Sequence, residues 1–70
     1  MDEALARKIS VELSSMVAAF NRLSDLTLSI ADENERRGYR RSLGELMARC
    51  DNDLIQPISR AYPHLDPIKE

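Results

Sequence analysis

The sequence predicts an all-α protein that folds as an antiparallel two-helix hairpin. Residues 1–37 contain no proline or glycine, and apolar residues recur at steps of three and four in both halves of the chain. Such steps place side chains on one stripe of a helix. The two stripes are out of phase and are separated by the polar run at residues 32–37. One continuous helix would turn them in different directions, so a hairpin is favoured.

The first helix is predicted over about residues 3–31. Asp2 and Glu3 stand at its start, where carboxylates suit the unpaired N–H groups and the helix dipole. Its apolar stripe is Ile9, Leu13, Met16, Phe20, Leu23, Thr27 and Ile30. More apolar residues flank this stripe, namely Val17, Ala19, Leu26 and Ala31. The first helix therefore has more apolar surface than one neighbouring helix would cover.

A turn at about residues 31–34 is expected to lead into a second helix over about residues 33–62. Asp32 and Glu35 have the spacing of a capped helix start, in which the Asp32 carboxylate accepts from free N–H groups. The apolar stripe of this helix is Tyr39, Leu43, Leu46, Met47, Cys50, Leu54, Ile58 and Ala61.

Prolines shape the end of the second helix. Pro57 lacks an N–H, and its ring collides with the carbonyl of Asp53 in a regular helix. The helix must therefore kink there, or stop near Gln56 and restart with Pro57 in its first turn. Pro63 disfavours helix at the residue before it, so residues 63–70 are expected to form an irregular C-terminal tail.

The size of the chain predicts a partner chain. Seventy residues form at most one domain with a marginal core, which usually needs disulfides, a metal or another chain. One cysteine and one histidine exclude an intrachain disulfide and a structural zinc cluster of Cys and His. We expect a homodimer in which two hairpins form a four-helix bundle. Another protein is a further partner that the sequence leaves open. The expected self-association face is Leu13, Val17, Ala19, Phe20 and Leu26.

Charge and hydropathy narrow the class of protein. Twelve acidic and ten basic residues give a net charge of −2, which argues against a general polyanion binder and against nucleic acid as a partner. No stretch is apolar enough to span a membrane, and the N-terminus has no apolar core of the signal-peptide type. The expectation is a soluble, cytoplasmic protein that does not bind membranes.

The segment "ERRGYRRS" at residues 35–42 carries Arg36, Arg37, Arg40 and Arg41. One interpretation is a solvated helix start with ion pairs, since Glu33 lies four residues before Arg37 and Glu45 lies four from both Arg41 and Arg49. The alternative is an anion-binding site with Tyr39 stacking beside it. The first is favoured, because basic residues in the first turns oppose the helix dipole.

No catalytic residue, metal ligand or cofactor site is predicted. Asp51-Asn52-Asp53 resembles the start of a calcium loop but lacks its glycine and terminal glutamate. Cys50 lies on the apolar stripe, and the only histidine, His64, lies in the expected tail. The sequence thus favours a small non-enzymatic protein–protein interaction or regulatory module. Two alternatives stay open: a nucleic-acid-associated regulator using the four arginines, and a small enzyme with a site built across the dimer interface.

Overall fold

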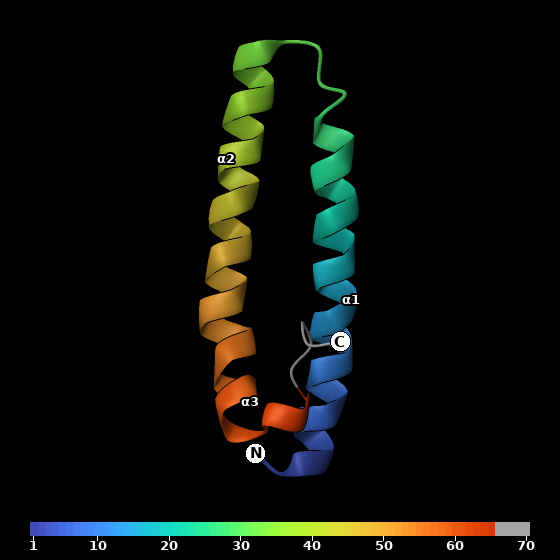
Figure 1. Cartoon of the computed structure of the whole chain (residues 1–70), viewed down its shortest axis with the longest axis vertical. Helices are drawn as coiled ribbons and strands as arrows, with labels where there is room; N and C mark the ends of the chain where they lie inside the picture. Colours follow the sequence, from blue (N-terminus) through green and yellow to red (C-terminus); the bar gives the residue numbers. More distant parts are fainter. Residues whose placement is uncertain (66–70) are drawn as a thin grey trace.

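In the computed structural model, which describes residues 1–65, two long helices run antiparallel and lie side by side (Figure 1). They are α1, Glu3–Thr27, and α2, Glu33–Cys50. The chain continues through a π-helical segment, η1, Asp51–Ile55, into α3, Gln56–Ala61, and then a 3₁₀ turn, η2, Pro63–Leu65. This part of the chain contains no strand, so the predicted all-α class is confirmed.

The molecule is a rod of 46 × 17 × 17 Å with a radius of gyration of 14.4 Å. A compact domain of this length would have a radius of gyration of about 11 Å. The elongation follows from the architecture, because two parallel cylinders share only one line of contact. Much of the side-chain surface of both helices is therefore left facing outward.

Both long helices begin where the sequence predicts. Oδ1 of Asp2 accepts a hydrogen bond from the backbone N–H of Leu5 at 2.8 Å. At the start of α2, Oδ2 of Asp32 accepts from the N–H of Glu35 at 2.7 Å. Each carboxylate satisfies one of the N–H groups that have no partner inside the helix. The predicted capping role of Asp32 is thus confirmed.

Helix α1 ends at Thr27, four residues earlier than predicted. Beyond it, the N–H groups of residues 28–30 bond to carbonyls three residues back, at 3.1–3.2 Å, which tightens the chain into turns. The Thr27 hydroxyl donates to the Ser24 carbonyl at 2.6 Å. Threonine and serine side chains often compete in this way with the regular helical ladder. The turn consequently begins at Leu28, and Asp32 closes it.

The helix passes Pro57 by widening into a π-turn. The N–H of Gln56 bonds to the Asp51 carbonyl, five residues back, and Pro57 lies in the first turn of α3, where its missing N–H costs least. One extra residue in the turn shifts the following side chains by about 100° around the helix axis. Ile55 is consequently 2% exposed, whereas Leu54 is 48% exposed. The predicted stripe is therefore wrong at Leu54 and at Ala61, which is also exposed.

The hydrophobic core lies where the first half of α1 meets η1, α3 and η2. Its buried members are Ala6, Leu13, Cys50, Ile55, Ile58 and Leu65, and Ile9, Val17, Phe20 and Tyr62 pack against them. A smaller buried contact lies toward the turn, where Leu43 and Thr27 are also buried. Most of the core is thus gathered at the end of the rod that holds the N-terminus (Figure 1).

The segment after α3 packs against α1. The Ser10 hydroxyl donates a buried hydrogen bond to the Leu65 carbonyl. The Tyr62 hydroxyl donates to the Met1 carbonyl at 2.9 Å, and Nε2 of His64 lies 2.6 Å from Oε1 of Glu3. Residues 63–65 are therefore ordered by contacts with the start of the chain, where an irregular tail was predicted. The rest of that predicted tail, residues 66–70, lies outside the described residues.

No helix within residues 1–65 is long and apolar enough to cross a membrane.

Candidate functional site

An apolar groove runs along one side of the line where α1 and α2 meet. It consists of two adjoining hollows of about 280 and 320 Å³ that share Leu46. Leu23, Tyr39, Ser42, Leu43 and Leu46 line the hollow nearer the turn. The other hollow is lined by Met16, Phe20, Leu46, Arg49, Cys50, Asp53 and Leu54. We call these two hollows together the seam groove.

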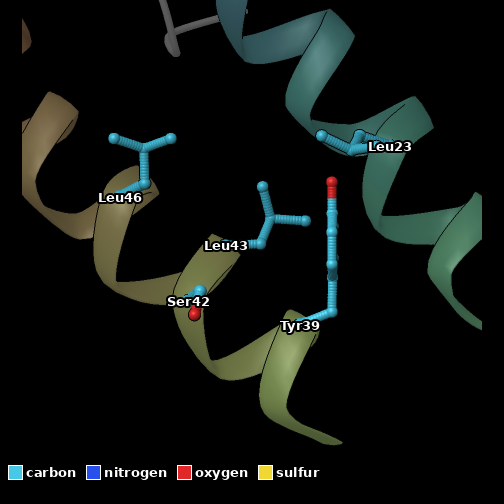
Figure 2. Close-up of a pocket in the computed structure, with 5 residues that line it drawn as sticks. All are labelled: Leu23, Tyr39, Ser42, Leu43 and Leu46. Carbon is cyan, nitrogen blue, oxygen red and sulfur yellow. The ribbon is translucent and has the colours of Figure 1, made fainter. Parts of the chain in front are cut away.

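Figure 2 shows the hollow nearer the turn in close-up. Tyr39 extends from α2 toward Leu23 of α1, and Leu43 and Leu46 stand on the next turns of α2 (Figure 2). Leu43 is buried, whereas Tyr39 and Leu46 are more than half exposed. The hollow therefore has a closed floor and open apolar walls.

Helix periodicity explains why the groove is on one side only. Side chains three positions apart lag by about 60° around the axis, so residues in such steps drift to one flank of the helix. From the buried Leu13, these steps lead to Met16 and Ala19, and from Leu23 to Leu26. The opposite flank of α1 carries polar residues at comparable angles, including Ser14, Asn21 and Asp25. Four of the nine large exposed apolar side chains in residues 1–65 line the seam groove, namely Met16, Tyr39, Leu46 and Leu54.

The structure separates the residues of the expected self-association face. Leu13 is buried in the core of the hairpin, and Val17 packs half-buried against that core. Phe20 also packs there and lines the seam groove. Ala19 and Leu26 are exposed on the groove flank of α1. Leu13 therefore belongs to the interior of one chain and is not accessible to a second copy.

The sequence did not single out Met16, Tyr39 or Leu46 as exposed residues, because all three lie on the stripes expected to face the other helix. In the structure only the centre of each stripe is covered, and these three side chains remain exposed at its edge. The signal available in the sequence was the width of the stripes. It did not tell which edge would stay open.

Two of the four clustered arginines bind the end of α1 and the turn that follows it. Nη1 of Arg36 donates to the Ile30 carbonyl at 2.9 Å. Nη1 of Arg40 donates to the Ser24 carbonyl at 2.8 Å and to Oγ1 of Thr27 at 2.6 Å. The last turn of α1 has no basic residue of its own, and the N–H of Leu28 bonds to the Asp25 carbonyl instead of to the Ser24 carbonyl four residues back. The two guanidinium groups of α2 supply both the donors and the positive charge that this helix end favours.

The remaining arginines lie on the exposed surface. Arg37 pairs with Glu33 at 2.8 Å, as the spacing predicted, and both side chains are about two-thirds exposed. Arg49 pairs with Asp53 at 3.2 Å and so does not use Glu45. Arg41 makes no hydrogen bond or ion pair within residues 1–65. The cluster therefore offers an anion fewer free donors than its sequence indicates.

The groups considered for catalysis and metal binding are dispersed. Cys50 is buried in the core and His64 contacts Glu3. Among the described residues, no three His, Cys, Asp or Glu side chains are grouped so as to hold a metal ion. Comparison with protein-family models, with curated proteins and with solved structures finds no match to this chain. The seam groove and the exposed apolar side chains are therefore the features of the described residues that most favour a function.

Proposed function

We propose that this chain is a small, non-enzymatic protein–protein interaction module that works as a homodimer, with two hairpins packed into a four-helix bundle. The single observation that carries the proposal is the balance of apolar side chains. In residues 1–65 only seven apolar residues are buried, whereas nine large ones are exposed: Met1, Leu5, Val11, Met16, Leu26, Leu28, Tyr39, Leu46 and Leu54. Scattered exposed apolar residues are normal, but several of these are contiguous around a groove.

The limited capacity of a two-helix core supports the same proposal. A domain of this size rarely gains enough stability from one core, and oligomerisation is a common remedy. Packing two hairpins against each other gives each helix further apolar neighbours, as in four-helix bundles. We further propose that the module acts in the cytoplasm, since its lone buried thiol, Cys50, suits a reducing compartment.

Two measurements test the proposal: the mass of the protein in solution, and the dependence of its melting temperature on protein concentration. In sedimentation equilibrium we expect a species of twice the 8.0 kDa chain mass. The melting temperature should rise over about a hundredfold range of protein concentration, because association stabilises only the folded form. A monomer mass with a concentration-independent melt would reject the proposal.

The two other functions have weaker support. A nucleic-acid-associated regulator would use the arginine cluster, yet Arg36, Arg37 and Arg40 already have partners inside the chain. An enzyme with a site across the dimer interface would need polar groups facing the partner. Ser42, Arg49 and Asp53 are the polar residues lining the groove, and the last two pair with each other.

A further inference from the structure

We propose that the seam groove is the surface through which two copies of this chain meet, around a two-fold axis near Leu46. This inference rests on the proposed self-association and specifies the face and the symmetry of the contact. Leu26 and Ala19, exposed beside the groove on α1, extend the same surface.

The accessible surface area of the chain is larger than expected for its mass. The accessible surface of the chain is 5253 Å² for a mass of 8.0 kDa. A folded monomer of that mass typically exposes about 4450 Å². The excess is about 800 Å², which is close to the area that each partner buries in a standard protein–protein interface. The chain as a whole thus exposes more surface than a compact monomer of its mass, by about the area that one interface of ordinary size removes.

Exposed apolar side chains indicate which face of the hairpin forms the contact. Four of the exposed large apolar side chains line the groove, namely Met16, Tyr39, Leu46 and Leu54. On the opposite flank of α1, a second copy would cover Ser14, Asn21 and Asp25 and would have to desolvate them. The groove flank instead offers apolar side chains from both helices, with Ser42, Arg49 and Asp53 as its polar lining.

The charges at the rim of the groove are compatible with a two-fold contact. A two-fold contact brings the same patch of both copies together, so a rim of one sign would repel itself. The rim of the groove carries both signs, since Arg49 pairs with Asp53 at 3.2 Å and both side chains are at least half exposed. Together Arg49 and Asp53 add no net charge to the rim, so two such rims do not repel each other.

Leu46 gives the position of the axis, because it lines both hollows and therefore lies at the middle of the groove. A two-fold axis there brings the two Leu46 side chains together. It also sets the hollow with Met16 and Leu54 in one copy against the hollow with Leu23 and Tyr39 in the other. Each hollow is then filled by apolar side chains that protrude from its counterpart.

The experiment compares Leu46→Glu and Met16→Glu, one groove position on each helix, with Val11→Glu as a matched control. Val11 is 60% exposed and Leu46 is 55% exposed, but Val11 points away from α2. The full chain and its variants are studied by sedimentation equilibrium, with circular dichroism to verify folding. We expect both groove variants to raise the dimer dissociation constant by about 30-fold or more, as for a central interface residue. Val11→Glu should change it by less than about threefold, as for an exposed surface position.

The possible outcomes distinguish failure of the proposed self-association from failure of the seam groove as its surface. A wild-type chain that stays monomeric rejects the proposed self-association and the groove together. A wild-type dimer that Leu46→Glu and Met16→Glu leave intact, or that Val11→Glu weakens equally, retains the dimer and rejects the groove. If circular dichroism shows that one of the two groove variants is unfolded, the dissociation constant of the other variant tests the groove.

Discussion

Nη1 of Arg40 on α2 lies 2.6 Å from Oγ1 of Thr27 at the end of α1. Thr27 is buried, and its hydroxyl in turn donates to the Ser24 carbonyl at 2.6 Å. Arg40 also donates to that carbonyl directly. These hydrogen bonds join the last turn of one helix to the second turn of the next. They give the arginine-rich segment a structural task inside the hairpin.

Replacing Arg40 with methionine, which keeps much of the aliphatic stem, should lower the free energy of unfolding by about 1–2 kcal/mol. Hydrogen bonds to a charged donor typically contribute more, but the Arg40 side chain is partly screened by solvent. Arg41→Met is the control and should change stability by less than about 0.5 kcal/mol. Urea unfolding of both variants measures the difference. Equal effects would mean that the contact with Thr27 adds nothing.

Truncating Ile55 to alanine should cost more than truncating Phe20. Ile55 is almost fully buried in the core, so we expect a loss of about 3 kcal/mol. Phe20 is half-buried and lines the groove, so Phe20→Ala should cost about 2 kcal/mol in the monomer. Both are measured by urea unfolding in a Leu46→Glu background, which is expected to remove any contribution of association. The reverse order would show that the core centres on Phe20.

Deleting Asn52 should be tolerated if Pro57 is replaced by alanine at the same time. Asn52 is exposed within the π-helical segment, which holds one residue more than a regular helix needs. Its removal restores α-helical spacing and keeps Ile55 and Ile58 directed at the core. We expect a cooperative thermal melt, followed by circular dichroism, with helix content close to that of the wild type.

The control for this deletion is removal of Gly44, which is also exposed but lies in the regular part of α2. There the loss of one residue turns the following side chains, among them Cys50, by about 100° away from α1. The hairpin should then unfold or melt far earlier. If the two deletion variants have the same melting temperature, the π-turn does not determine which side chains of the following helix face the core.

Labelled DNA and RNA, titrated at two salt concentrations, test the nucleic-acid alternative. We expect only weak background binding, and little difference for a variant carrying both Arg37→Gln and Arg41→Gln. Arginines that gripped phosphates would instead give a salt dependence that flattens by about one unit of slope per lost contact. Tight, salt-sensitive binding that the double variant loses would restore that alternative.

Much of the fold was predictable because it is local. The stripe on α1 and the caps at Asp2 and Asp32 depend on spacings of three and four residues, which the sequence displays directly. The sequence did not predict which side chains beyond Cys50 face the core. The sequence shows that Pro57 perturbs the helix, but whether the chain kinks, stops or widens depends on which response buries Ile55 and Ile58.

The site depends on contacts between the helices, so less of it could be predicted. Arg40 and the Ser24 carbonyl are sixteen residues apart, and they meet only because of the way α1 and α2 lie beside each other. The groove depends on the same geometry, which decides that Leu43 is covered and Leu46 is left open. The sequence showed an excess of apolar surface on the first helix but not where it would gather.

From the contacts between the two ends of the chain we expect a particular order of folding. Ser10 and Leu65 are 55 residues apart, and Tyr62 and Met1 are 61 apart, whereas Arg40 and Thr27 are separated by thirteen. Each doubling of a loop costs about 0.6 kcal/mol in closure entropy. The turn therefore forms first and the ends close last. Weakening Arg40 should slow folding, whereas weakening Leu65 should mainly speed unfolding. We therefore expect the end of the rod with the larger core to assemble last and to open first.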